Sequence, residues 1–333
     1  MSLQLLKNKK VLFFSPAFFD YENIIVDEMR NMGAQVRLYD ERNITSALGR
    51  AILKTFPFVF TKKANRYYQR IINEFDKDVV DYVLIVKCDM VTKDTILAFR
   101  KKFPSAKLCL HVWDSKQNIP KLDEKIDLFD YASSFDRGDC IKDCRLKFRP
   151  LFFSKVFEKS VVEKKYDIVF CGTIHSDRYY IISKIKKWCS ENNRSFYCFA
   201  YLQSVFIYFF YRISNKGFKH VKKTDFTFEK KSQNEIAHIE SSSKVILDIQ
   251  HPKQTGLTMR TIEMIGMNKK IITTNVDIKN YDIYDEHNIY IISRHEPTID
   301  LAFLDGPYVE IPERIRNRYM LSNWILDVLG ING

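Results

Sequence analysis

A short strand, a turn, an amphipathic helix and a second strand follow one another at the start of the chain, and the same pattern begins again near its middle. The first pattern consists of a buried strand at Val11–Ser15, a helix at Glu22–Met32 that Gly33 ends, and a strand at Gln35–Tyr39. The second begins with the strand Asp167–Cys171. Strands joined through helices by short connections form parallel sheets with both faces covered. The sequence therefore predicts an α/β protein with two doubly wound sheets.

Further elements continue each pattern. Strands are expected at Tyr82–Val86, Lys107–His111, Tyr131–Ser134, Lys244–Gln250 and Lys270–Thr274, and helices at Ala64–Glu74, Thr92–Phe103 and Tyr179–Cys189. The pattern pauses at Arg149–Lys165, and a chain of 333 residues is long for one core. We therefore predict two similar domains, residues 1–155 and residues 156–333, with a cleft between them. A final helix at Arg314–Leu329 is expected to pack back on the first domain.

The chain carries a formal net charge of +12, which favours an anionic partner. Nucleic acid fits this charge, but no helix-turn-helix, RNP or zinc-knuckle pattern supports it. A nicotinamide dinucleotide is not favoured either, because no G-x-G-x-x-G follows the first strand of either half. A phosphorylated ligand and an anionic membrane surface remain as partners.

No metal and no cofactor are expected. Cys140 and Cys144 lie four residues apart, but no second Cys or His pair nearby completes a zinc site. The D-x-D sequence Asp76-Lys77-Asp78 precedes a strand, so we interpret it as a solvated loop. The N-terminal segment runs into a strand instead of a signal-peptide core, and no window of about 18 apolar residues occurs. These features predict a cytoplasmic protein.

The segment that follows the strand Lys244–Gln250 indicates a ligand site most strongly. It forms a loop and then a helix, with Gly256 at the junction. Thr255 or Thr258 can cap this helix, whose first amides and positive dipole end suit a phosphate. The sequence from Thr255 through Leu257 to Thr258 is therefore a candidate phosphate-binding loop.

Two charged residues follow in the same helix. Arg260 and Glu263 lie three residues apart and point from one helix face. A cation for a diphosphate and a carboxylate for a ribose diol are what a nucleotide-sugar site requires. The alternative interpretation is an ordinary β-α-β unit with a surface Arg–Glu pair.

A second candidate turn opens the second half of the chain. Gly172, Thr173, His175 and Arg178 lie where its first strand gives way to its first helix. Because ligands bind at the carboxyl ends of strands in doubly wound sheets, this turn and the Gly256 turn are predicted to share one pocket. The alternative is a glycine that only makes a tight turn.

The first half carries polar residues at its strand ends. A carboxylate that deprotonates a hydroxyl is expected among them, and Asp114 is the first candidate, with Asp20 the second. Asp114 precedes Ser115 and can equally be a helix cap. Other polar residues at these ends are Ser15, Lys87, Asp89, His111 and Asp136.

Two segments combine aromatic and basic residues, Gly49–Arg70 and Tyr201–Lys231. The second contains the aromatic run Phe206–Tyr211 and seven Lys or Arg against two acids. This composition is typical of a segment that lies on an anionic lipid surface, with Lys216, Lys219, Lys222 and Lys223 as its cations. The alternative interpretation is a buried helix at Phe206–Phe210 with solvent-facing lysines.

At the two glycine turns the chain resembles bacterial glycosyltransferases of the GT-B class, in particular their CgeB-like and lipopolysaccharide- or capsule-assembly branches. The resembling segments are FCGTIHSDR, HPKQTGLTMRTIEMIGMNKKIITTN, NVDIKNYDIYDEHNIYII and HVWDS. The resemblance implies two Rossmann-like domains, with a nucleotide-sugar donor held mainly by the second and a glycan or lipid-linked glycan acceptor by the first. Thr255 stands where retaining members carry one Glu of a pair, which favours inversion.

The resemblance also assigns roles to individual residues. Gly256, Leu257 and Thr258 would contact the diphosphate, Arg260 would neutralise it, and Glu263 lies near the ribose position. The expected activity is metal-independent sugar transfer to a surface glycan on the inner face of the cytoplasmic membrane. Two alternatives remain: a nucleotide-sugar epimerase or hydrolase of the same shape, and a non-catalytic protein that binds a glycan or another transferase.

Overall fold

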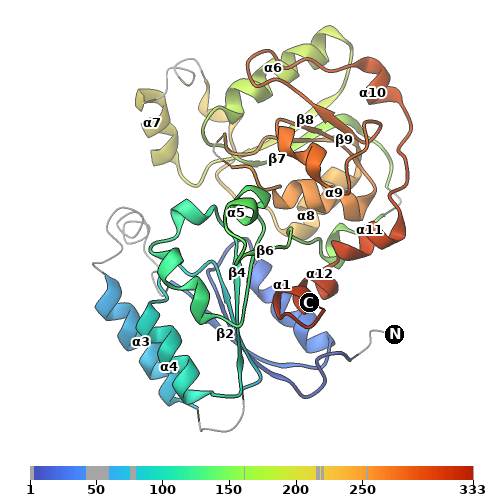
Figure 1. Cartoon of the computed structure of the whole chain (residues 1–333). Coiled ribbons are helices and arrows are strands. Elements are labelled where there is room, and N and C mark those ends of the chain that lie inside the picture. The colour runs from blue at the N-terminus through green and yellow to red at the C-terminus, as the bar shows by residue number, and fades with distance from the viewer. Residues whose placement is uncertain are drawn as a thin grey trace. The chain divides into compact units, whose positions relative to one another are not determined.

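The computed structural model describes residues 4–42, 60–75, 80–160, 162–214, 218, 221–252 and 254–332. The chain divides into two compact units, residues 1–151 together with 321–333, and residues 152–320 (Figure 1). Asp76-Lys77-Asp78, Lys216, Lys219 and the first half of the segment Gly49–Arg70 lie outside the described residues.

The first unit contains a parallel sheet of six strands in the order β2-β1-β3-β4-β5-β6. Its strands are β1 (Lys10–Ser15), β2 (Gln35–Asp40), β3 (Tyr82–Val86), β4 (Lys107–Val112), β5 (Tyr131–Ser134) and β6 (Lys147–Phe148). Among its described residues, the α-helices are α1 (Tyr21–Asn31), α3 (Thr61–Asn73), α4 (Lys93–Lys102), α5 (Arg137–Lys142) and α12 (Leu321–Val328). α3 and α4 lie side by side, and α12 lies beside α1 (Figure 1).

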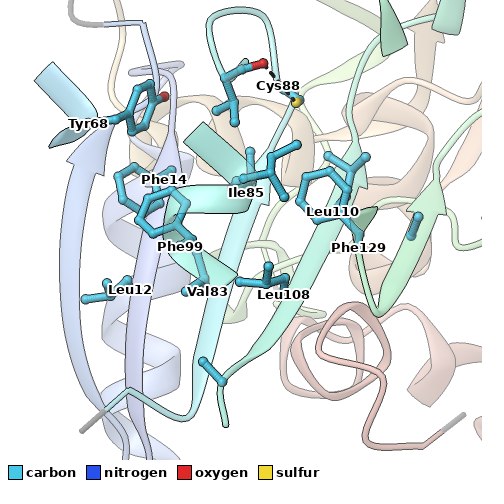
Figure 2. Packing of buried hydrophobic residues seen from close by; sticks show 14 of the residues in the cluster. Leu12, Phe14, Tyr68, Val83, Ile85, Cys88, Phe99, Leu108, Leu110 and Phe129 are labelled. Carbon is cyan, nitrogen blue, oxygen red and sulfur yellow. Dashed lines mark hydrogen bonds between the residues drawn. The ribbon is translucent and has the colours of Figure 1, made fainter. Parts of the chain in front are cut away.

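Alternate residues of these strands form the core between the sheet and helices α3 and α4, as Figure 2 shows. Phe14 of β1 is central: its ring lies 5.4 Å from that of Tyr68 in α3 and 5.3 Å from that of Phe99 in α4. Because side chains alternate across a strand, the neighbouring Phe13 faces the opposite side and is equally buried. Both faces of the sheet are thus covered, as the apolar strand sequences predict.

The second unit contains a parallel sheet of five strands in the order β11-β10-β9-β7-β8. Its strands are β7 (Tyr166–Thr173), β8 (Phe196–Tyr201), β9 (Ser243–Asp248), β10 (Lys270–Thr273) and β11 (Ile289–Ile291). Its α-helices are α6 (Arg178–Glu191), α7 (Val205–Ser214), α8 (Gln233–Ser241), α9 (Met259–Met267), α10 (Leu301–Asp305) and α11 (Glu313–Arg318). Residues of α6 and α10 pack on one face of the sheet, and residues of α8 pack on the other.

The two sheets share one topology. Counted within each unit, the first five strands have the order 2-1-3-4-5 in both cases. In a doubly wound sheet of this order the chain direction switches between the first and third strands, and ligands bind outside the carboxyl ends of the strands there. The switch points lie between β1 and β3 and between β7 and β9. The predicted fold class, α/β with two Rossmann-like doubly wound domains, is confirmed.

The unit boundary follows Leu151, whereas the sequence analysis placed it after residue 155. Phe153 explains the difference, because its ring lies against Gly266 in α9, where an added Cβ would be 2.6 Å from a ring carbon. A Cβ on Gly266 would also lie 2.3 Å from the carbonyl oxygen of Phe157. The segment after Leu151 therefore packs closely on α9 and belongs to the second unit.

The final helix is interrupted, although one helix at Arg314–Leu329 was expected. It consists of α11 and α12, and the break lies at Tyr319 and Met320. The carbonyl of Tyr319 accepts a hydrogen bond from the amide of Phe153 (2.9 Å), so it is not free for a helical bond. After the break, α12 packs on the first unit, where Nζ of Lys107 donates to the carbonyl of Gly330 (2.6 Å).

Candidate functional site

The carboxyl edge of the second unit's sheet brings several predicted ligand-binding residues together. β7 ends at Gly172 and Thr173, and Gln250 and His251 follow its neighbour β9. The chain leaves β7 towards β8 on one side and returns to β9 on the other, which creates the switch point. The predicted turn at Gly172 therefore lies at the place where a doubly wound sheet binds ligands.

Arg178, the first residue of α6, spans the two strand ends at this switch point. Its Nε donates to the carbonyl of Ile249 (2.5 Å) and its Nη1 to the carbonyl of Thr173 (2.7 Å). Burial lowers the pKa of Arg178 to about 10, so the guanidinium stays charged at neutral pH. Among the described residues, Nη2 of Arg178 has no hydrogen-bond partner. A planar guanidinium with a remaining donor suits a phosphate oxygen.

Arg294 joins Arg178 at the same edge, although the sequence analysis did not identify it. Its Nη1 lies 2.9 Å from both carboxylate oxygens of Asp177, and its Nη2 donates to the carbonyl of Gln250 (2.7 Å). Arg294 follows β11, whose three residues were too few to be recognised as a strand from sequence. A basic residue just after a fifth parallel strand is the signal that would have identified it.

Two histidines flank these arginines. The ring centroids of His175 and His251 lie 5.5 Å apart. Burial, with a further contribution from Arg178, lowers the pKa of His175 to about 3. His175 is therefore neutral at physiological pH and contributes hydrogen-bonding groups, but no charge, to this edge.

The Gly256 loop is held by polar contacts behind it. Thr258 is the N-cap of α9: its Oγ accepts from the amide of Thr261 (3.2 Å) and donates to Oδ1 of Asp248 (2.9 Å). Of the two caps that the sequence allows, the structure thus uses Thr258 and leaves Thr255 exposed. Leu257 is buried. The hydroxyl of Thr258 is already engaged twice, so a phosphate would approach the loop backbone.

Arg260 and Glu263 form a partly buried ion pair with a third residue. Nη1 of Arg260 lies 2.7 Å from Oε2 of Glu240 in α8 and 2.9 Å from Oε2 of Glu263. The side chains of Glu240 and Glu263 are 0% and 1% exposed. The pair is therefore not the surface pair of the alternative interpretation, because Glu263 holds Arg260 and does not face solvent.

Burial raises the pKa of Glu240 to about 8, even with Arg260 beside it. Glu240 and Glu263 share the guanidinium of Arg260, which leaves the position of Arg260 tightly determined. Removal of Arg260 would leave the buried acids Glu240 and Glu263 without their shared cationic partner, a strongly unfavourable arrangement.

The carboxyl edge of the first unit's sheet carries a chain of ion pairs. Nη2 of Arg42 lies 2.9 Å from Oδ2 of Asp89, and Nζ of Lys87 lies 3.5 Å from the same oxygen. Nζ of Lys87 also lies 3.0 Å from Oδ2 of Asp114. These residues follow β2, β3 and β4, so the ion pairs connect the ends of three strands across β1.

The turn after β3 has a strained backbone. Lys87 and Cys88 have φ values of 83° and 72°, in the left-handed region that side chains with a Cβ rarely adopt. Nζ of the buried Lys125 donates to the carbonyls of Cys88 (3.0 Å) and Val91 (3.1 Å), which holds the turn in place. Strain of this kind persists where the surroundings fix it, and such residues cluster at functional sites.

Glu41 lies beneath this chain of ion pairs and is fully buried. One of its oxygens accepts from the amide of Met90 (2.7 Å), and the other has no partner among the described residues. Burial, with a contribution from the nearby Asp89, raises the pKa of Glu41 to about 8. Glu41 is thus a protonated acid at neutral pH, and the sequence analysis did not single it out.

Asp114, the first candidate base, has both carboxylate oxygens engaged. Oδ2 pairs with Lys87, while Oδ1 accepts from the amide of Ser115 and from Nδ2 of Asn118, both at 2.9 Å. Burial raises the pKa of Asp114, but Lys87 and these hydrogen bonds outweigh it, so that the pKa lies below its usual value. The carboxylate is ionised and a weak proton acceptor.

Asp20, the second candidate, is exposed at the start of α1. Its Oδ1 accepts from Nδ2 of Asn23 (2.7 Å), and within the described part of the chain its Oδ2 has no partner. Asp20 has a φ of 69°, so its backbone is strained as well. The ring of the next residue, Tyr21, lies 5.9 Å from that of Trp113, so the Asp20 and Asp114 segments are neighbours.

Two other polar residues at these strand ends have structural roles. His111 is fully buried, its Nδ1 lies 2.9 Å from Oγ of Ser133, and burial lowers its pKa to about 3. Asp136 is the N-cap of α5, where its Oδ1 accepts from the amides of Gly138 and Asp139. Neither side chain is available to a ligand.

In the described part of the chain, no three His, Cys, Asp or Glu side chains converge as a metal site would require. Over the same ranges, no helix is both long and apolar enough to cross a bilayer.

Solved structures provide matches, whereas no protein-family model and no curated protein matches the sequence. HepE from Anabaena in complex with UDP-glucose has a TM-score of 0.59 and 10% identity, covering 97% of this chain and 99% of that chain. The N-terminal domain of Candida albicans trehalose-6-phosphate phosphatase has a TM-score of 0.56 and 10% identity, covering 97% of each chain. UDP-GlcNAc 2-epimerase from Methanocaldococcus jannaschii has a TM-score of 0.53 and 10% identity, covering 97% and 99%. Similarity at this identity establishes the fold, which is that of the GT-B class.

Proposed function

We propose that this chain is a glycosyltransferase that moves a sugar from a nucleotide-sugar donor to a surface-polysaccharide acceptor. The observation that carries the proposal is the pair Arg178 and Arg294 at the switch point of the second sheet. Two guanidinium groups there suit the diphosphate of a nucleotide sugar. The fold is shared with HepE, whose structure contains UDP-glucose.

The second unit binds the donor in this proposal. Nη2 of Arg178 and Nε of Arg294 are the donors that their described contacts leave for phosphate oxygens. Gly172 and Thr173 at the end of β7 and the loop from Gly256 to Thr258 border the proposed site, and the N-terminus of α9 adds its dipole. His175 lies at the same edge as a neutral hydrogen-bonding group.

Arg260 and Glu263 act mainly as positioning residues. Their pairing with the buried Glu240 fixes the first turns of α9 and hence the loop that precedes it. The part of Arg260 that remains exposed adds positive potential to the donor site. This assignment differs from the direct ribose contact that the family resemblance implies for Glu263.

The first unit binds the acceptor and supplies the base. We assign the base to Asp20 ahead of Asp114, since Asp20 is exposed and keeps one oxygen free among the described residues. The acceptor hydroxyl oxygen attacks the anomeric carbon, and its proton passes to the carboxylate of Asp20. The bond from the anomeric carbon to the phosphate oxygen breaks, and the nucleoside diphosphate leaves with the electron pair.

The leaving group carries the charge that develops in this step. Arg178 and Arg294 stabilise that charge, the role that a divalent cation has in metal-dependent transferases. A single displacement of this kind inverts the configuration at the anomeric carbon. We therefore propose a metal-independent, inverting transferase of the CgeB-like type. Its acceptor is a lipopolysaccharide, capsule or related glycan, and the reaction takes place on the cytoplasmic side of the membrane.

Two experiments test the proposal in sequence. A thermal-shift screen against UDP, GDP, CMP and dTDP should show one preferred nucleotide, because a ligand that binds the folded state stabilises it. The corresponding nucleotide sugar, labelled in the sugar, should then transfer label to a lipid-linked glycan acceptor. Stabilisation by none of the four nucleotides would contradict the donor site.

The similarity to UDP-GlcNAc 2-epimerase supports a second candidate, epimerisation of a nucleotide sugar without any acceptor. The label experiment distinguishes the two. An epimerase converts the labelled donor to its isomer in the absence of acceptor, whereas a transferase releases the nucleoside diphosphate only when an acceptor hydroxyl takes the sugar.

A further inference from the structure

Helix α7 of the second unit exposes a continuous apolar face. Four large hydrophobic side chains recur along it at the spacing i, i+3, i+4 and i+7, which places them on one side of a helix. Their exposed fractions are 85% for Phe206, 53% for Phe209, 64% for Phe210 and 86% for Ile213. In Figure 1, α7 stands at the margin of its unit.

The opposite face of α7 attaches the helix to the unit. Tyr208 is only 3% exposed, and its hydroxyl donates to the carbonyl of Val221 (2.9 Å). The ring of Tyr211 lies 5.2 Å from that of Phe218, and Phe218 stacks on Phe226 at 5.8 Å. The helix is therefore fixed through its tyrosines and does not need its apolar face for folding. The alternative that the run Phe206–Phe210 is a buried helix is wrong for its outer residues.

Basic residues accompany the apolar face. Arg212 is exposed on α7 itself, and Lys222 and Lys223 are exposed next to Val221, whose carbonyl accepts from Tyr208 of α7. The segment Tyr201–Lys231 contains two acidic residues, Asp225 and Glu229. Asp225 already accepts from the amide of Lys222 and from the hydroxyl of Tyr179, so it is engaged within the fold. The surface of α7 thus presents bulky apolar groups beside an excess of positive charge.

We propose that the outer face of α7 docks on an anionic lipid surface. Aromatic and aliphatic side chains that enter the boundary between headgroups and acyl chains, next to cations that contact anionic headgroups, are the features of an interfacial helix. A second copy of the chain fits less well, since face-to-face pairing of α7 would bring Arg212, Lys222 and Lys223 of both copies together. This docking does not depend on the transferase proposal, but it would hold the protein where lipid-linked acceptors are found.

Vesicle co-sedimentation of the full chain tests this inference. The protein should bind phosphatidylcholine vesicles that contain phosphatidylglycerol, and not pure phosphatidylcholine, and binding should fall with added salt. Phe206→Ser with Ile213→Ser should lower the partition coefficient at least about tenfold, because two large apolar groups no longer enter the lipid. Lys222→Gln with Lys223→Gln should lower it as well.

Ile141→Ser is the matched control. Ile141 is also an isoleucine on a helix surface, 68% exposed, but it lies on α5. This control should bind vesicles as the unchanged protein does, and all variants should keep the same melting temperature. Vesicle binding that ignores lipid charge and the α7 substitutions would overturn the proposal. The proposal would also be overturned if the protein did not bind vesicles and formed a dimer that the Phe206→Ser substitution dissociates. The outer face of α7 would then serve self-association.

Discussion

Nζ of Lys87 lies 3.0 Å from Oδ2 of Asp114, an ion pair that joins the strained turn after β3 to the segment after β4. The same Nζ lies 3.5 Å from Oδ2 of Asp89. Lys87 therefore connects two carboxylates at the switch point of the first sheet. This pairing accounts for the lowered pKa of Asp114 and makes that residue a poor base and a good anchor.

Exchange of Asp20 for Asn should remove the proposed base. Asp20→Asn should lower turnover at least about 100-fold, because the acceptor proton loses its carboxylate, while nucleotide affinity stays the same. Asp114→Asn is the comparison: it should reduce turnover less and lower the melting temperature, since Lys87 loses a partner. A larger loss of turnover in Asp114→Asn than in Asp20→Asn, at equal stability, would return the role of base to Asp114.

Replacement of Arg260 tests its structural role. Arg260→Met should lower the free energy of unfolding by about 3–5 kcal/mol, as when one partner of a buried ion pair is removed. The triple variant Arg260→Met, Glu240→Gln, Glu263→Gln should recover part of this loss, because no buried charge is left unpaired. Urea denaturation gives both values. Equal stability of Arg260→Met and the unchanged protein would show that the ion pair is not structural.

Stability should depend on pH through Glu41. Burial raises the pKa of Glu41 from 4.5 to about 8 in the folded state, so between these values the folded protein holds a proton that the unfolded chain has lost. The free energy of unfolding should then fall as pH rises through this range, by at most about 1.4 kcal/mol per pH unit for one group.

Glu41→Gln should flatten this dependence and raise stability near pH 8. Some slope should remain, since the pKa of Glu240 is raised in the same direction. Denaturation curves at several pH values provide the test, and parallel pH profiles for the variant and the unchanged protein would contradict it.

Chelation tests the metal-independent mechanism. Addition of EDTA should leave sugar transfer intact, because the arginines at the second switch point neutralise the leaving group. The control is a metal-dependent transferase in the same assay, which EDTA should stop. Complete inhibition that added Mg²⁺ or Mn²⁺ reverses would overturn this part of the proposal.

Much of the fold followed from local patterns. The strand Tyr82–Val86 has the bounds that the sequence predicts. It is a continuous apolar run, which is typical of a strand that is buried on both faces of a parallel sheet. The glycine turn at Gly172 was placed at a strand end, and it proved to lie at the switch point. Such features depend on residues that are close in sequence.

Other features depend on residues far apart in sequence, and these were missed. One partner of Arg260 is Glu240, which lies on a different helix. The burial of the Arg260 ion pair could therefore not be predicted from the spacing of Arg260 and Glu263. The bonding of Tyr319 to Phe153 likewise interrupts a segment whose sequence favours one helix. Arg294 was missed because β11 is too short to give a periodic signal.

In the proposed reaction, Arg294 and Arg178 bind the diphosphate of a nucleotide sugar. Arg194 is the matched control for Arg294. Arg294 pairs with Asp177 at the carboxyl edge of the second sheet. Arg194 also pairs with an aspartate, Asp305 (2.6 and 2.9 Å), but it lies near the start of β7 and β8. Isothermal titration with the preferred nucleoside diphosphate should show that Arg294→Met loses about 1.5–3 kcal/mol of binding free energy. Arg194→Met should lose none. Equal affinities of both variants and the unchanged protein would contradict the account.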